Sequence, residues 1–190
     1  VLKADCDNLY KNHLSFLVIP SVLIAAYSPS QNVIDCAFKS EKFRFVDRLY
    51  ACEIQNPDDF DNADMKIETI KGRHLRGKSN ADVEAIFIRN KTMSQFPKDI
   101  GSLFPNIKLI AVENVQLEAI NRGALETFPN LEYLFLSDNK IQAIDDGWLE
   151  KNPKIIFISV HGNPITEIHP NAFSNLFELT LMDLSGQQCR

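Results

Sequence analysis

The sequence repeats itself every 24 residues over the range 83–178, and this period constrains the fold more than any other feature. The units begin at Val83, Ile107, Leu131 and Ile155, and a fifth begins at Leu179. A fixed period of about 20 to 50 residues is typical of a solenoid, in which each repeat packs against its neighbours. The sequence therefore predicts a stack of similar coils.

Within each unit, apolar residues occupy positions 1, 4, 6, 11 and 14, counted from the start of the unit. Position 4 is Ile86, Ile110, Leu134, Ile158 and Met182, and position 6 is Ile88, Val112, Leu136, Val160 and Leu184. Positions 4 and 6 have the two-residue period of a strand, so both side chains point to one face. The pattern predicts a short strand, a turn and a return segment in each coil. Stacking would place the strands in a parallel sheet, about 4.8 Å apart.

The unit Leu131–Lys154, LEYLFLSDNKIQAIDDGWLEKNPK, resembles the leucine-rich repeat, LxxLxLxxNxLxxL followed by a variable half. The resemblance covers about half of the chain. It implies an α/β fold, a right-handed leucine-rich-repeat solenoid with a parallel concave β-sheet, over residues 83–190. In this family, asparagine at position 9 hydrogen-bonds the backbone from coil to coil, and Asn139 and Asn163 match it. The other units have Lys91, Val115 and Gln187 there, with Asn90 and Asn114 one position earlier.

Residues 1–28 are predicted to contain a signal peptide. Leu14–Ala26 (LSFLVIPSVLIAA) has the length of a signal-peptide hydrophobic region and is too short to span a bilayer as a helix. The alternative is a buried strand or helix of the folded domain. A signal peptide would make the protein secreted. The chain has no apolar run longer than this one, so the sequence predicts no membrane span.

Residues 29–82 are predicted to form an amino-terminal β cap. Two strand-like runs, VIDCAF and FVDRLYACEIQNP, are separated by a polar turn and carry Cys36 and Cys52. A bridge between these cysteines, sixteen positions apart, would stabilise a hairpin by about 3 kcal/mol. The four cysteines permit three pairings. Cys189 is either a small core residue or half of a carboxy-terminal cap bridge.

The run from Glu68 to Asn90, ETIKGRHLRGKSNADVEAIFIRN, resembles the amino-terminal flank of secreted leucine-rich-repeat proteins of flies and mosquitoes. This resemblance implies an extracellular insect recognition protein, with innate immunity among the roles. Such a protein binds its ligand and is not an enzyme.

No motif in the sequence predicts catalysis or a cofactor. The acidic loop Asp58–Asp64 (DDFDNAD) lacks the DxDxDG spacing and closing glutamate of a calcium loop, so a solvated loop is favoured. The sequence has no HExxH, GxSxG or CxxC motif and no glycine-rich phosphate loop. A net charge of −5 without a basic run argues against nucleic acid as a partner.

The resemblance to leucine-rich repeats places positions 2, 3, 5, 7 and 8 on the concave face, and three aromatic residues stand there. Tyr133, Phe135 and Phe157 form an apolar ribbon in adjacent coils. Exposed aromatic residues are favoured anchors for a protein ligand, which makes this ribbon the predicted binding site. Its rim is predicted to comprise Asp138, His161, Arg89 and Glu113. The alternative is that the aromatic residues pack on one another and shield the backbone. Trp148, in the variable half, is expected in the core or in the packing of the convex side.

Asn90-Lys91-Thr92 is the one N-x-S/T sequence in the chain, and it stands where the first strand gives way to a turn. In a secreted protein Asn90 would carry a glycan; the alternative is a chance occurrence.

Three alternatives to a secreted recognition protein stay open. They are the ectodomain fragment of a cell-surface receptor, an inhibitor that wraps an enzyme, and a self-associating module. The last would pair through the fifth strand, whose apolar face is predicted to have no cap at the carboxy-terminal edge.

Overall fold

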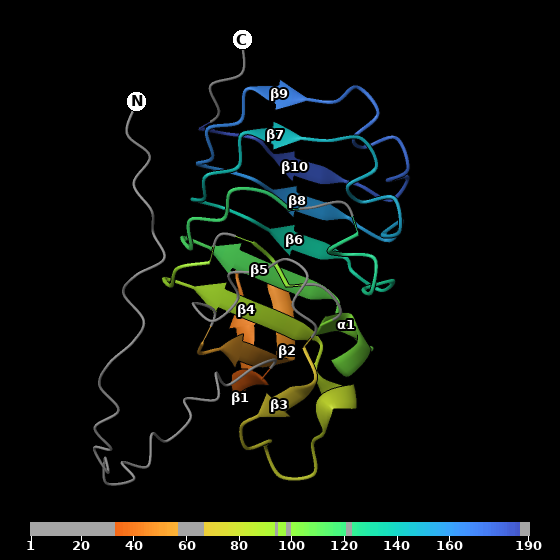
Figure 1. Ribbon diagram of the computed structural model, residues 1–190. Helices are drawn as coiled ribbons and strands as arrows, with labels where there is room; N and C mark the ends of the chain where they lie inside the picture. Colours follow the sequence, from red (N-terminus) through yellow and green to blue (C-terminus); the bar gives the residue numbers. More distant parts are fainter. Residues whose placement is uncertain (1–32, 57–66, 94, 98–99, 121–122, 187–190) are drawn as a thin grey trace, which may run out of the picture.

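The computed structural model describes residues 33–56, 67–93, 95–97, 100–120 and 123–186 (Figure 1). The predicted signal peptide, the acidic loop and Cys189 lie outside these residues. The main sheet has eight strands in the order β10-β8-β6-β5-β4-β2-β1-β3. They are β1 (Val33–Phe43), β2 (Val46–Ile54), β3 (Thr69–Lys71), β4 (Ala85–Arg89), β5 (Leu109–Glu113), β6 (Tyr133–Phe135), β8 (Phe157–Ser159) and β10 (Leu181–Asp183).

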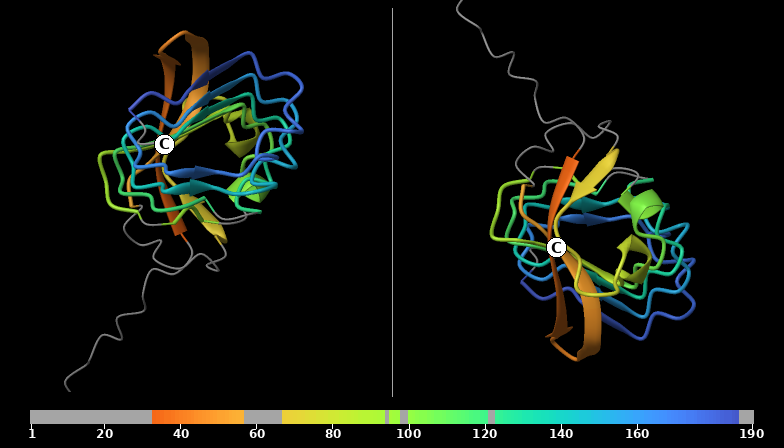
Figure 2. Two further views of the ribbon diagram at one scale, coloured as in Figure 1. Left: turned by 90° about the horizontal axis from the view of Figure 1, so that it is seen from above. Right: turned by 90° about the horizontal axis from the view of Figure 1, so that it is seen from below.

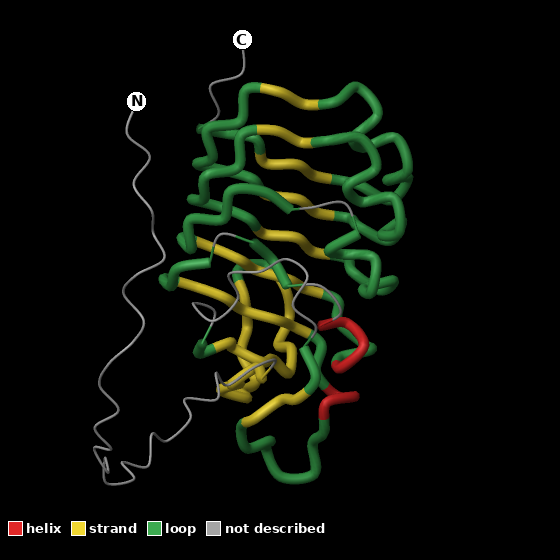
Figure 3. Tube along the Cα trace, viewed as in Figure 1, coloured by secondary structure: helices red, strands yellow, loops and turns green. Residues whose placement is uncertain are grey.

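The strands of the repeat units are parallel and in register, which confirms the predicted solenoid. Ile110 pairs with Leu134, Leu134 with Ile158, and Ile158 with Met182, so position 4 of each coil lies beside position 4 of the next. Figure 3 shows the short strands stacked one above another, with loops at both ends that join them into coils. The 24-residue period is therefore one turn of the stack.

The core lies between the main sheet and the return segments. The side chains at positions 4 and 6 of the first four units are buried there, together with Trp148, as predicted. Little of the described structure is helical, because the coils return mostly through turns. In the described residues, helix is confined to α1 (Ile100–Leu103) and the 3₁₀ turn η2 (Asn80–Asp82). On the return side, β7 (Ala143–Ile144) and β9 (Glu167–Ile168) pair in a second parallel sheet.

Buried asparagines join successive coils, as the resemblance implied. Asn139 Oδ1 accepts hydrogen bonds from the backbone N–H groups of Val115 and Leu117, at 3.1 and 3.2 Å. Its Nδ2 donates to the carbonyls of Val112 and Leu136, at 2.7 and 2.9 Å. The asparagine therefore satisfies backbone groups of its own coil and of the preceding one, which could not reach water.

Asn163 has the corresponding role one coil further on. Its Oδ1 accepts from the N–H of Ile141, and its Nδ2 donates to the carbonyls of Leu136 and Val160. Sequence analysis missed a third buried asparagine, Asn152, which donates to two carbonyls of the preceding return segment. The equivalent positions of the neighbouring units are Phe128 and Leu176, so no repeated pattern predicted Asn152.

Position 8 of every unit adopts a left-handed backbone. The φ angles are 54° at Asn90, 53° at Asn114, 57° at Asp138, 69° at Gly162 and 77° at Gly186. Asparagine, aspartate and glycine tolerate this conformation better than other residues. The asparagines of the first two units therefore shape the turn, and an exposed side-chain hydrogen bond from Asn114 to Asn90 links their two coils. A Cβ atom at Gly162 would stand 2.3 Å from Asp138 Oδ1, so a side chain here would also collide with the coil below.

Replacing Asn139 by alanine is expected to lower the free energy of unfolding by about 3 kcal/mol, because buried N–H and carbonyl groups lose their partner. Urea denaturation would measure the loss. Asn130→Ala is the matched control, since Asn130 is half-buried and accepts an exposed hydrogen bond from Lys154. Equal midpoints for the two variants would contradict the bridging role of Asn139.

The segment predicted to form an amino-terminal cap contains an antiparallel hairpin of β1 and β2, and the predicted Cys36–Cys52 disulfide joins its strands. The base of β2 pairs in parallel with β4 and so extends the main sheet. The pairing register shifts between Glu41 and Phe43, and such a bulge bends a strand. Figure 1 shows the orange end of the hairpin crossing behind β4 and β5. Viewed along the stack, the hairpin turn lies outside the ring of coils (Figure 2).

The hairpin turn comprises Arg44 and Phe45 alone. The polar turn expected before Phe45 is therefore wrong, because most of that segment belongs to β1. Lys39 and Glu41 alternate along this strand, and Lys39 contacts Glu53 of β2. Polar residues with a two-residue period suit an exposed strand face as well as they suit a turn.

Candidate functional site

The structure brings the three predicted aromatic residues together on the concave face, the face of the main sheet opposite the core. Tyr133 and Phe135 come from β6 and Phe157 from β8, and Tyr133 pairs in register with Phe157. The ring centroids of Phe135 and Phe157 are 4.8 Å apart. The alternation along each strand aims these side chains away from the core.

The prediction that this ribbon is exposed is wrong for two of its members. Phe135 is 0% and Phe157 6% exposed, whereas Tyr133 is half-buried. The end of the β1–β2 hairpin covers them. A second apolar cluster forms between the hairpin and the sheet from Phe43, Val46, Ala51, Ala85, Phe87, Leu109, Ala111, Phe135 and Phe157. These outward positions are apolar because they face a part of the same chain.

Arg89 lies in an ion-pair network between the hairpin and β4. Its guanidinium contacts Glu41 and Glu53, each at 3.0 Å, and lies 4.4 Å from the ring centroid of Phe87. Lys39 contacts the same two carboxylates. Burial alone would raise the pKa of Glu53, but the hydrogen bond from Lys39 and the charge of Arg89 outweigh it and lower that pKa. Arg89, predicted as a rim residue, therefore fastens the hairpin to the sheet.

Glu113 has a similar contact with the hairpin turn. Its carboxylate accepts a hydrogen bond from Arg44, whose guanidinium lies 5.0 Å from the ring centroid of Phe135. Burial raises the pKa of Glu113, and the nearby charges of Arg44 and Arg89 only partly oppose this rise. Sequence analysis missed Arg44 and Phe45. No signal in the sequence marked the turn there, because the segment lacks the glycine, asparagine or aspartate that two-residue hairpins favour.

Asp138 and His161 lie in the turns that follow β6 and β8. The backbone N–H of Asp138 donates to the carbonyl of His161 at 2.8 Å, which joins the two turns. His161 Nδ1 and Ser185 Oγ are 2.8 Å apart. Asp138 also lines a shallow polar groove along the edge of the sheet, with Arg44, Arg89, Asn90, Glu113 and Asn114. The predicted rim residues therefore lie along one edge, beside the covered aromatic cluster.

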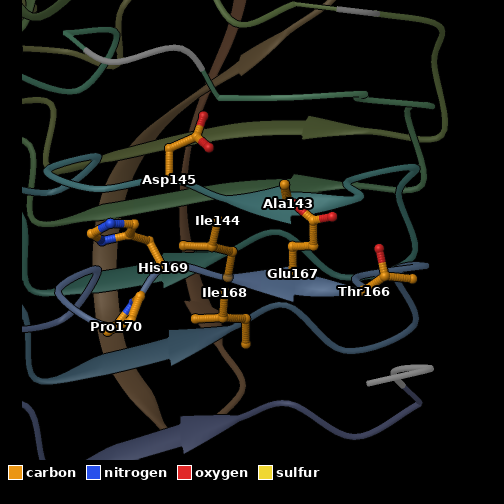
Figure 4. Close-up of a pocket in the computed structure, with 8 residues that line it drawn as sticks. All are labelled: Ala143, Ile144, Asp145, Thr166, Glu167, Ile168, His169 and Pro170. Carbon is orange, nitrogen blue, oxygen red and sulfur yellow. The ribbon is translucent and has the colours of Figure 1, made fainter. Parts of the chain in front are cut away.

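A separate groove on the return side has no arrangement typical of a catalytic site. It is lined by Ala143, Ile144, Asp145, Thr166, Glu167, Ile168, His169 and Pro170 (Figure 4). Figure 4 shows His169 and Thr166 at opposite ends of this row, so they do not form a nucleophile–base pair. His169 Nδ1 accepts a hydrogen bond from the N–H of Asn171. Among the described residues, no three histidine, cysteine or acidic side chains gather as metal ligands.

The repeat geometry agrees with a comparison against protein families. The family model described as "Leucine rich repeat" matches residues 105–165 and 129–188. Residues 105–188 carry leucine-rich repeats. The hairpin and β4 lie before the matched leucine-rich repeats and continue the same sheet. A comparison with curated proteins found no match.

Solved leucine-rich-repeat structures resemble the chain. The APL1 leucine-rich repeat domain aligns with a TM-score of 0.59 and 15% identity, over 84% of this chain and 38% of that one. The LRIM1/APL1C complex aligns with a TM-score of 0.49 and 15% identity, over 85% and 32%. The Toll–Spatzle complex, from Drosophila, aligns with a TM-score of 0.49 and 15% identity, over 60% and 16%.

The first of these likenesses shows the fold alone, because the identity is low. The chain spans 38% of the length of the APL1 domain and less of the other two. In the part of the chain that the structure describes, no helix has the length and apolar character needed to cross a membrane.

Proposed function

We propose that this chain is a non-enzymatic protein-binding module that works outside the cell and recognises its ligand on the concave side. The observation that carries the proposal is an exposed phenylalanine at the hairpin turn. Phe45 is 59% exposed, and its ring lies 4.9 Å from that of Phe157 and 6.2 Å from that of Tyr133. Exposed aromatic residues on a rigid apolar base are typical of binding surfaces.

The ligand-contacting surface is therefore placed around the hairpin turn, not on the centre of the sheet. We call it the tip patch and define it by Phe45, Tyr133, Phe157 and Leu181, of which Phe157 is buried beneath Phe45. Leu181 is 58% exposed and pairs in register with Phe157 on the neighbouring strand. Phe135 supports this patch from below, and Arg89 and Glu113 hold the hairpin in place.

The Cys36–Cys52 disulfide supports an extracellular location, because disulfides persist in oxidising compartments and are rare in the cytosol. The sequence resemblance to secreted proteins of flies and mosquitoes adds innate-immune recognition to the proposal. Typical leucine-rich-repeat domains bind proteins, which favours a binding role over catalysis.

Photo-crosslinking tests the binding role directly. The photoreactive amino acid benzoylphenylalanine replaces Phe45 in one variant and Phe177 in a matched control. Phe177 is 89% exposed and lies outside the tip patch. After illumination in the extracellular fluid of the source organism, we expect a protein adduct at position 45 well above that at position 177. Equal adducts at both positions, or none at position 45, would refute the proposed surface.

Asn90 is expected to carry a glycan when the protein is secreted. The side chain is exposed, and its Oδ1 accepts a hydrogen bond from Asn114 Nδ2 at 3.0 Å. Glycosylation takes place on the other atom of the amide, Nδ2. Endoglycosidase treatment should lower the mass of the wild-type protein, whereas Asn90→Gln should show no such change.

Asn114→Gln is the matched control, because Asn114 has the same position and backbone angle in the next coil but no glycosylation sequence. This control should keep the mass shift. A secreted wild-type protein whose mass is unaffected by the endoglycosidase would contradict the prediction.

A further inference from the structure

The tip patch is an apolar cluster built from two distant parts of the chain. Phe45 comes from the hairpin turn, whereas Tyr133, Phe157 and Leu181 occupy position 3 on three adjacent strands, β6, β8 and β10. Phe157 lies under the ring of Phe45 and connects Tyr133 on one side with Leu181 on the other. The patch therefore exists only when the hairpin is folded onto the sheet.

The residues of the hairpin turn suit contact rather than turn formation. Two-residue hairpin turns favour glycine, asparagine or aspartate, because central residues need positive φ angles. Here Arg44 adopts a φ of 53°, which is costly for a residue of its size. Arg44 contacts Glu113 and Phe135, and Phe45 contacts Phe157. The contacts of Arg44 account for its placement, whereas Phe45 stays 59% exposed in spite of its contact.

Carboxylates stand around the patch. Asp47 and Glu132 lie near Tyr133, where their negative charges contribute, after burial, to a raised pKa of the phenol. Asp183 lies two residues after Leu181 on the same strand and therefore on the same face. The neighbouring turn adds Asp138, which is exposed. Lys108 partly offsets Glu132, since it is close enough to interact with that charge while it binds Glu84.

The arginines on this side of the described structure are already engaged within the chain. Arg44 pairs with Glu113, and Arg89 pairs with Glu41 and Glu53. Arg48 donates to the carbonyl of Ser40 on the neighbouring strand. Arg48 keeps its charge, but the charged groups placed beside Tyr133 and Leu181 are Asp47, Glu132 and Asp183, so the charges there are mainly negative. Interfaces match opposite charges across the contact, which selects the partner and its orientation.

We propose that the tip patch binds a protein segment in which a large apolar side chain is flanked by lysine or arginine. The apolar side chain packs against Phe45 and Leu181, and the flanking cations face Asp47, Glu132 and Asp183. This inference rests on the proposed function and specifies the chemistry of its partner. An acidic or uncharged partner would meet the same apolar surface but would be disfavoured by these three carboxylates.

A peptide selection tests this specificity even though the natural partner is unidentified. The probe is a phage-displayed library of random peptides, panned on the full chain with counter-selection on a Phe45→Glu/Leu181→Glu variant. Both substitutions are at exposed positions, so the variant should keep its fold. We expect the retained peptides to carry an aromatic or long aliphatic residue with basic residues on either side.

The affinity of one selected synthetic peptide is then measured on two charge-neutralised variants. Asp47→Asn/Glu132→Gln/Asp183→Asn removes the three carboxylate charges around the tip patch. It should weaken binding about tenfold, because each exposed ion pair with the peptide contributes modestly. Glu118→Gln/Glu126→Gln/Glu178→Gln is the matched control. It removes three exposed carboxylates that are not among those around the tip patch, and it should change the affinity less than about twofold.

Three results would overturn the inference: retained peptides without basic flanks, no enrichment over the counter-selected variant, or equal losses in the two charge variants. A protein adduct at position 45 together with any of these would leave the proposed function intact and refute only the partner class. If position 45 also gave no adduct above the Phe177 control, the proposed function would fail with it.

Discussion

Replacing Leu134 by aspartate is expected to abolish the folded repeat array. Leu134 is 0% exposed and lies on β6 between Ile110 and Ile158 of the adjacent coils. A carboxylate at this place would have apolar neighbours on both sides and no partner for its charge. The cost, on the order of 5 kcal/mol or more, equals much of the stability of a typical domain. Circular dichroism during thermal denaturation should show no cooperative transition.

Phe177→Asp is the matched control for this experiment. It introduces the same charge in place of a large apolar residue, but at a position that is 89% exposed. Its midpoint should stay within a few degrees of the wild type. A folded Leu134→Asp variant would mean that the strand register is shifted by one residue, since such a shift exchanges the buried and exposed faces.

Phe135→Ala is expected to destabilise the protein by about 3 to 5 kcal/mol, although its side chain points away from the main core. The ring is fully buried and lies 5.0 Å from that of Phe43 and 4.8 Å from that of Phe157. Its removal leaves a cavity between hairpin and sheet and takes away the surface under Arg44. Guanidinium denaturation measures the loss. Faster tryptic cleavage after Arg44 would report the loosened hairpin.

Phe45→Ala provides the comparison, because Phe45 touches the same cluster from its exposed side. Its loss of stability should be about 1 kcal/mol or less. A Phe135→Ala variant as stable as Phe45→Ala would mean that the hairpin does not cover the sheet in solution. The concave face would then be open, as the ribbon of aromatic residues suggested from the sequence.

The repeat architecture could be predicted from the sequence because its physical cause is local and recurs. Positions 4 and 6 must be apolar in every coil to fill one shared core, so their spacing reveals both the strand and its register. Asn139 and Asn163 were predictable for the same reason, whereas the singular Asn152 was not. The Cys36–Cys52 bridge could be predicted because its cysteines stand on two strand-like runs, at a sequence separation that a hairpin can bring together.

Only the tertiary structure decided which residues of the concave face are covered. Strand alternation determines that Phe135 and Phe157 point away from the main core, but it contains no information about what lies above them. That depends on the bulge between Glu41 and Phe43, and on contacts between hairpin and repeats that are remote in sequence, such as that of Arg44 with Glu113. The sequence by itself determined the solenoid and its register, and it favoured the Cys36–Cys52 disulfide without excluding the other pairings. Only the folded chain decided which aromatic residues are buried and that Phe45 is left exposed to a partner.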